Sequence, residues 1–319
     1  MLFHTDKGKF SVCRPQQQDF THLNFKEVKI MKKQALLSTA FILFSGFCMQ
    51  AFEWPQAETT ADSIHSEFGQ LRGGVLSSSI IYKDIAQIHA SDEGTITAVI
   101  TNHDDDFGWF ESSLGTTVII SHGDGLSTVY SNLDDDYLNS NLTENLNIKA
   151  KEDIGKSGYT AWQEKSNGLE FKVYDRKNLS AVNPKLLMPR IAREVPLETG
   201  GLTLVDKNGT AHNVAQEKRL AAGTYLIYKT RQTNAVPFKT IVAINGESVE
   251  TIVYDTLKVN EGFLGVNGNN HYAINEVYPD NDKFLLAKAQ LSKGQNTLTV
   301  TLVNIQENAV SVTYKLDIY

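Results

Sequence analysis

VIISHGDGLSTVYSNL, residues 118–133, is the stretch that decides the fold class of this chain. Apolar and polar residues alternate on both sides of the turn HGDG, a pattern typical of two β-strands joined by a hairpin. Residues 87–102 alternate in the same way around a Glu-Gly turn. Beyond these strands, no run with helical periodicity exceeds about two turns, and only residues 59–72 could contain a helix. We therefore predict an all-β chain in which short strands form a barrel or a sandwich.

The composition is that of a globular protein long enough for two ordinary domains. The 319 residues are 41% hydrophobic and 21% charged. We expect no long disordered linker, because no compositionally biased tract is present. The net charge of −7 argues against a general affinity for nucleic acid or anionic lipid.

Residues 31–51, MKKQALLSTAFILFSGFCMQA, have the layout of a secretory signal peptide. Two lysines precede an apolar core of about a dozen residues, and a small residue, Ala51, follows it. The apolar run is short for a membrane span, so we expect no stable span after cleavage, with an uncleaved anchor as the alternative. The sequence therefore predicts export to the periplasm, the cell envelope or the extracellular space.

Two further expectations concern the same end of the chain. Residues 1–30 are polar and irregular and precede the export signal, which indicates a mis-assigned upstream extension with translation starting at Met31. Lipidation at Cys48 is an alternative to simple cleavage, although Phe47 stands where a small residue is normal. Cleavage near Ala51 would remove both cysteines, Cys13 and Cys48, so the mature chain would have no disulfide.

Residues 68–190 resemble the lysostaphin/LytM-type peptidoglycan metallopeptidases. The resemblance rests on six short motifs that occur in the same order as in that family. They are EGTI at 93–96, HGDG at 122–125, LSTVYSNL at 126–133, IGKSG at 154–158, GLEF at 168–171 and VNP at 182–184. The resemblance implies a small β-barrel that, in the enzymes, holds one zinc ion.

The family uses a His and an Asp four positions later, then a lone His after a Tyr-x step, then a His-x-His pair. Three of these ligands hold Zn²⁺ and leave a fourth position for water, while the other histidines assist proton transfer. Carried over to this chain, the positions are Val75, Ser79, Asn132, Gly168 and Glu170. All five are substituted, and Glu170 alone could bind a metal. We therefore predict no zinc, no other cofactor and no catalytic residue, as in the degenerate EnvC- and NlpD-like members.

Other residues could in principle hold a metal. The Asp runs at 104–106 and 134–136 could bind Ca²⁺, which prefers oxygen ligands, but solvated loops explain them more simply. His122 lies in the HGDG turn, where the resemblance implies a packing residue with no direct catalytic part. His89 alternates with Ile88 on an ordinary strand.

The second half of the chain is predicted to be a different module. Residues 297–302 and 310–318 alternate cleanly, and Asn-Gly pairs at 208–209 and 245–246 predict hairpin turns. Seven or eight short strands over this length predict an immunoglobulin-like β-sandwich without a disulfide. The predicted organisation is a lead-in segment at 52–67, a LytM-like domain at 68–190 and the sandwich at 191–319.

The preferred functional hypothesis is an exported, catalytically inactive peptidase-like protein. It would bind peptidoglycan or regulate a cell-wall hydrolase through the former active-site groove, which we expect to be small, mostly neutral and lined by all five substituted positions. One alternative is a zinc metalloendopeptidase that cleaves peptidoglycan cross-bridges with an atypical site. Another is a structural envelope scaffold.

Overall fold

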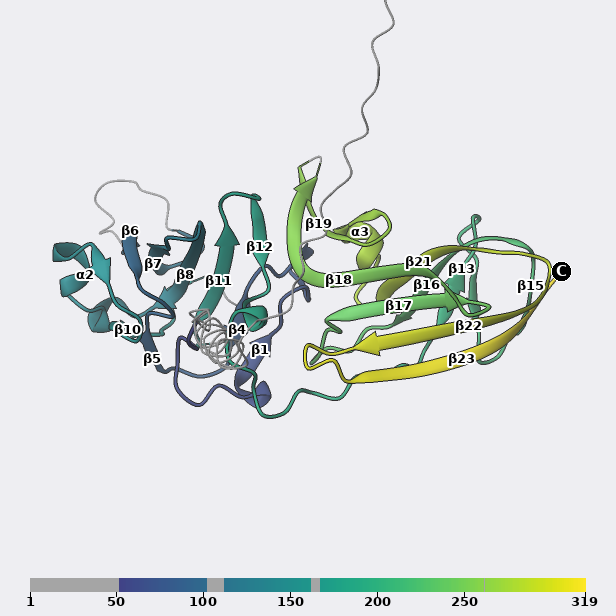
Figure 1. Ribbon diagram of the computed structural model, residues 1–319, viewed down its shortest axis with the longest axis horizontal. Helices are drawn as coiled ribbons and strands as arrows, with labels where there is room; N and C mark the ends of the chain where they lie inside the picture. Colours follow the sequence, from purple (N-terminus) through teal and green to yellow (C-terminus); the bar gives the residue numbers. More distant parts are fainter. Residues whose placement is uncertain (1–51, 102–111, 162–166, 261) are drawn as a thin grey trace, which may run out of the picture. The chain divides into compact units, whose positions relative to one another are not determined.

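The computed structural model describes residues 52–101, 112–161, 167–260 and 262–319. The predicted upstream extension at 1–30, the signal peptide at 31–51 and the Asp run at 104–106 lie outside the described residues. Within the described part, strands dominate, which confirms the all-β prediction (Figure 1). None of the helices described there is long and apolar enough to cross a membrane.

We call residues 52–190 the N-terminal module. Its strands are β1 (Ile64–Ser66), β2 (Leu71–Arg72), β3 (Val75–Leu76), β4 (Ile80–Tyr82), β5 (Gln87–His89), β6 (Gly94–Ile100), β7 (Thr116–Ser121), β8 (Leu126–Leu133), β9 (Asn147–Ile148), β10 (Asp153–Lys156), β11 (Glu170–Asp175) and β12 (Ser180–Val182). Short helical turns are η1 (Ala61–Ser63), η3 (Asp135–Tyr137), α2 (Asn141–Glu144) and η4 (Pro184–Leu186).

The helix considered for residues 59–72 does not form. Only η1 is helical there, and β1 and β2 follow it. Gly69 interrupts the segment with φ at +79°, a left-handed conformation that glycine adopts without strain. On β1, Ile64 and Ser66 are buried while His65 is exposed, so the period of two prevails over the weak helical period.

The hairpin predicted at 118–133 is confirmed as β7 and β8, which pair antiparallel from Thr116↔Leu133 to Ser121↔Ser127. His122 holds the turn. Its ring nitrogens lie 2.7 Å from the carbonyl oxygen of Glu93 and 2.9 Å from the hydroxyl of Thr128. The ring also packs edge-on against Phe52, so the predicted packing role is confirmed.

Strand β11 organises the N-terminal module. On one side it pairs along its whole length with β8, and the sheet continues through β7 and β6 to β9. On the other side, Glu170 and Phe171 pair with β4, while residues 173–175 pair with β12. The core beneath this sheet includes Tyr130, Phe171 and Val173, all fully buried.

We call residues 191–319 the C-terminal module. Its elements are β13 (Thr203–Val205), β14 (Ala211–Asn213), β15 (Arg219–Leu220), β16 (Gly223–Thr230), β17 (Lys239–Ile244), β18 (Glu247–Asn260), β19 (Phe263–Asn267), β20 (His271–Ala273), α3 (Ile274–Val277), β21 (Lys283–Leu291), β22 (Gly294–Val303) and β23 (Ala309–Ile318). One sheet has the order β14-β13-β16-β21, and the other runs β15-β23-β22-β17-β18.

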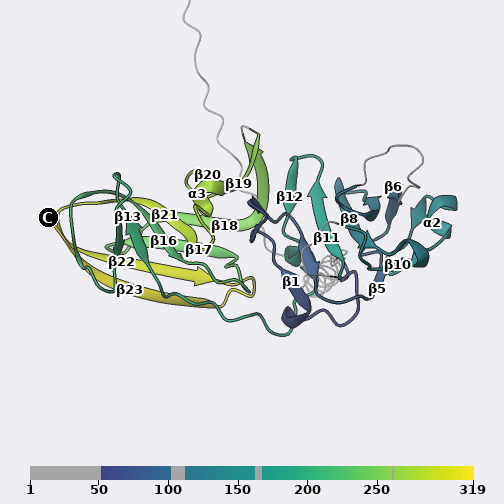
Figure 2. The same cartoon turned by 180° about the vertical axis from the view of Figure 1, so that it is seen from behind.

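The C-terminal module is the predicted β-sandwich (Figures 1 and 2). Its core combines Leu204 and Ile227 from one sheet with Val242 and Leu298 from the other, all with no exposed surface. The predicted Asn-Gly turns are present. At the β17–β18 turn, Asn245 and Gly246 have φ values of +54° and +87°, as a type I′ turn requires.

Buried contacts cross the predicted border at residue 190. Strand β18 is long enough to pair with β17 and, beyond a bend, with β12 through the contacts of residues 256–258 with Ser180–Val182. The side chain of Asn183 donates to the carbonyl of Tyr254 at 3.0 Å. Phe68 and Leu76 from the N-terminal module belong to the sandwich core.

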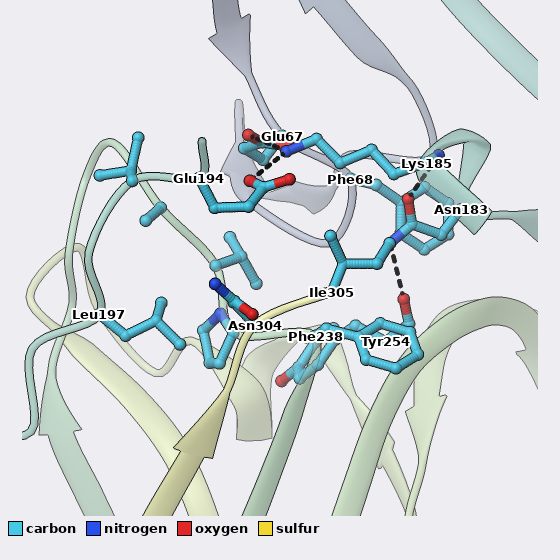
Figure 3. A pocket seen from close by; sticks show the side chains of 14 residues that line it. Glu67, Phe68, Asn183, Lys185, Glu194, Leu197, Phe238, Tyr254, Asn304 and Ile305 are labelled. Atoms are coloured by element: carbon cyan, nitrogen blue, oxygen red, sulfur yellow. Dashed lines mark hydrogen bonds and ion pairs between the residues drawn. The ribbon is translucent and has the colours of Figure 1, made fainter. Parts of the chain in front are cut away.

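A buried ion cluster lies beside this junction (Figure 3). The ammonium of Lys185 lies 2.8 Å from the carboxylate of Glu67 and 2.9 Å from that of Glu194, above a cavity of about 30 Å³. Burial by itself would lower the pKa of Lys185, but the two carboxylates outweigh this effect and raise the pKa above its ordinary value. Lys185 therefore remains charged and pairs with both carboxylates.

Lys185→Met should destabilise the protein by about 3–5 kcal/mol at neutral pH, because it leaves two carboxylates facing each other without a cation. A group with a raised folded pKa contributes its full stability below its ordinary pKa and loses it as pH rises through the folded value. The difference in urea unfolding free energy should thus be constant up to pH 10 or so and shrink above it. The exposed Lys218→Met is the matched control. Equal stability of the two variants would contradict the role of the cluster.

Candidate functional site

A cleft of about 630 Å³ lies over the start of β11. Its volume is in the range of small-ligand sites. Its walls come from β1, the β2–β3 hairpin, the serine run at 77–79, β4 and β11, and from two residues of the C-terminal module, Arg231 and Thr233. The side-chain amide of Gln70 donates to the carbonyl of Thr233 and ties this rim to the N-terminal module.

Three of the five predicted positions line this cleft: Val75, Ser79 and Glu170. Ser79 precedes β4, and β4 pairs with the start of β11, so the two strands bring Ser79 beside Glu170. The Ser79 hydroxyl donates to Oε1 of Glu170 at 2.7 Å. Two family positions that are far apart in sequence therefore meet in space.

An arginine that sequence reasoning missed completes this group. Arg72 Nη1 lies 3.0 Å from the same Oε1 of Glu170, in an ion pair in which the Glu170 side chain is only 8% exposed. Arg72 reaches it from the β2–β3 hairpin, whose Gly73-Gly74 turn has both φ values positive. Val75 lies directly opposite Arg72 in that hairpin and is 57% exposed. Where the family pattern would put a first ligand, this chain has a valine paired with a cation-bearing residue.

Asn132 and Gly168 do not line the cleft, which corrects the expectation that all five positions share one concavity. Asn132 is fully buried, with φ at +63°. Its Nδ2 donates to the carbonyls of Gly158 and Gly168 at 2.8 and 2.9 Å, and its Oδ1 accepts from the amide of Ala161 at 2.8 Å. Asn132 thus closes a loop rather than facing a ligand.

Comparison with known proteins identifies the family of this region. The model of peptidase family M23 matches residues 78–184. This segment is an M23 peptidase-family domain. A second family model matches residues 196–319. No curated protein sequence matches the chain.

Several solved structures are similar to part of the chain. One is a mutant catalytic domain of the prophage-encoded M23 protein EnpA from Enterococcus faecalis (20% identity, TM-score 0.30), which covers 38% of this chain and 88% of that chain. Another is the complex of SpoIIIAH and SpoIIQ (22%, TM-score 0.32; 42% and 98%). A third is a zinc-containing peptidase from Vibrio cholerae (17%, TM-score 0.34; 44% and 40%).

The residues at the ligand positions carried over from the family resemblance do not fit zinc. The side chain of Val75 has no atom that can bind a metal, and Ser79 has only a neutral hydroxyl. The carboxylate of Glu170 already forms an ion pair with the guanidinium of Arg72. A Zn²⁺ ion on Glu170 would share its oxygen with a fixed positive charge, whereas zinc sites require deprotonated N, S or O ligands without a competing cation. Across the described residues, no group of three or more His, Cys, Asp and Glu side chains could hold a metal ion.

The position of Gly168 in the M23 domain also leaves no room for a histidine. A Cβ atom built there would lie 2.2 Å from the carbonyl oxygen of Tyr82, which is backbone and cannot give way cheaply. Any side chain at residue 168 therefore requires the chain to shift, and a bulky substitution would disturb the fold rather than fill a groove.

The Asp run at 134–136 serves the local fold of the M23 domain. Asp134 caps η3 by accepting from the amide of Asp136 at 3.1 Å, and Asp135 accepts from the hydroxyl of Thr116. These bonds explain the run as turn chemistry, without a cation.

Asn132→Asp should lower the free energy of unfolding by at least about 2 kcal/mol, because it removes two donated hydrogen bonds and places a carboxylate against two buried carbonyls. Urea unfolding at neutral pH measures this loss. Asn145→Asp is the matched control, since Asn145 is exposed and uses only its acceptor oxygen, which Asp retains. Similar stabilities of the two variants would refute the structural role of Asn132.

Proposed function

We propose that this protein is an exported, non-hydrolytic M23-type protein that docks an extended peptide in the cleft of about 630 Å³. The peptide would belong to peptidoglycan or to a cell-wall hydrolase that the protein regulates. Export is inferred from the signal-peptide layout of residues 31–51. No catalytic residue and no cofactor are assigned.

The observation that carries the proposal is the ion pair between Arg72 and Glu170. A zinc peptidase needs a divalent cation to lower the pKa of its bound water and polarise the peptide carbonyl. In this chain a guanidinium is paired with Glu170, where the proposal would otherwise need a metal cation, and Ser79 donates a second contact to the same oxygen. The guanidinium is saturated with protons and has no open coordination position, so it can hold an anion but cannot activate water.

The cleft itself persists without the metal site. Its walls combine exposed apolar surface at Val75 with hydroxyls at Ser77 and Ser78 and with charged side chains. A concave site with a few convergent polar groups is typical of ligand binding. This favours docking over a role as a structural scaffold alone.

The first test is the metal content. Protein purified without an affinity tag should contain far less than one zinc per chain, because Glu170 is neutralised by Arg72. Adding zinc or a chelator should leave the melting temperature unchanged, since a ligand stabilises a fold only when it binds the native state. About one tightly held zinc per chain would instead support the atypical metalloendopeptidase.

The second test is binding through the cleft. The protein without its signal peptide should co-sediment with purified peptidoglycan, or capture a cell-wall hydrolase, without releasing soluble peptidoglycan fragments. Val75→Trp should weaken binding about tenfold, because an exposed strand position tolerates the ring while the ring obstructs the cleft. Val259→Trp is the matched control: Val259 is 63% exposed and lies on β18 outside the cleft. If both variants lose binding equally, or if neither variant weakens binding, the docking surface lies outside this cleft.

A further inference from the structure

We propose that the cleft recognises the carboxylates of an acidic peptide, and that Arg231 of the C-terminal module is part of the binding site. The inference deepens the proposed function and rests on it, because it concerns the same cleft. It makes the C-terminal module a part of the site rather than a spacer.

The cleft is not the small, mostly neutral groove expected from the sequence, because its lining has more cations than acids, a balance opposite to that of the whole chain. The chain carries a net charge of −7, yet the cleft is lined by three cationic side chains, Arg72, Lys172 and Arg231. Glu170 is the one acidic side chain among the lining residues, and Arg72 neutralises it. Two cations therefore remain to meet a ligand, and a cleft lined by one sign of charge concentrates ligands of the other.

The alternation of side chains along β11 places Lys172 at the cleft. It lies two residues after Glu170, so both side chains leave the same face of the strand. The side chain is half-buried beside the cleft, and within the described residues no ion pair engages its ammonium. Because its acidic neighbour Glu170 is paired with Arg72, this lysine is suited to a carboxylate from outside.

Arg231 is fixed by the end of the sandwich sheet. It follows β16, its amide donates to the carbonyl of Asp282 at 2.7 Å, and its Nε donates to the carbonyl of Asn281 at 2.7 Å. The first bond fixes the backbone of Arg231, and the second holds the guanidinium by one edge at the rim that Thr233 and Gln70 tie to the N-terminal module. A guanidinium fixed in this way loses little freedom when it binds a carboxylate.

His65 reports the same positive environment. Burial lowers its pKa, and the charges of Lys83 and Arg72 lower it further. Burial disfavours a charge of either sign, but the contribution of Lys83 and Arg72 favours a negative charge nearby. Ser78, half-buried on the same wall, adds a hydroxyl donor, and Leu71 and Val75 add apolar surface. The apolar wall favours a peptide with side chains over an inorganic anion.

Titration calorimetry with the protein without its signal peptide tests the inference. The probe is the free-acid peptide Ala-Glu-Ala-Glu-Ala, and its control is the C-terminally amidated Ala-Gln-Ala-Gln-Ala. We expect the acidic peptide to bind at least about tenfold more tightly, with an affinity that falls as salt rises. Lys172→Gln and Arg231→Gln should each weaken binding about tenfold, while Lys218→Gln and Arg193→Gln, which remove exposed charges outside the cleft, should not.

The outcomes separate this inference from the proposed function. Suppose that Val75→Trp weakens peptidoglycan binding or hydrolase capture, whereas Lys172→Gln and Arg231→Gln do not. This result would overturn the inference but leave the proposed function standing. Loss of all binding to the cell wall and to hydrolases would overturn both. If Arg231→Gln unfolds by circular dichroism, Arg231→Lys should bind the acidic peptide, and nuclear magnetic resonance should show that the peptide raises the pKa of His65. An unchanged pKa of His65 at saturating peptide would refute the inference.

Discussion

The pairing of β12 with β18 is the constraint on which the described structure depends. Three residues, Ser180–Val182, continue the sheet of the N-terminal module into the sandwich. This pairing fixes where the C-terminal module meets the cleft, and it buries Lys185 together with Glu67 and Glu194. Burying three charges is costly unless each is paired, so the cluster favours this one arrangement of strands over slipped ones. The placement of Arg231 at the cleft follows from the same join.

Glu170 links the fold to the function. Its backbone pairs with both β4 and β8. Its side chain accepts a hydrogen bond from Ser79 and forms an ion pair with Arg72. The start of β11 thus holds a charge-balanced centre in which a guanidinium is the cation. This pairing stabilises the surrounding strands, and under the proposed function it takes the place of a metal-bound carboxylate.

Much of the fold could be predicted because its signals are local. The hairpin at 118–133 and the Asn-Gly turn at 245–246 follow from alternation and turn chemistry within a few residues, whereas the packing role of His122 was implied by the family resemblance. The helix considered at 59–72 was wrong because a weak helical period competed with β-bridges to β4 that are distant in sequence. Gly168 and Asn132 occupy positions of the family motif, but motif spacing gives strand positions and not whether the neighbouring backbone leaves room for a side chain.

The sequence by itself determined that the chain is all-β, that residues 68–190 resemble the M23 peptidases, and that no histidine stands at the expected ligand positions. Only the tertiary structure decided which residues surround Glu170. Arg72 reaches it across 98 positions, and Arg231 approaches from another module. Such contacts depend on strand pairing between distant segments, and residue spacing along the chain does not encode them.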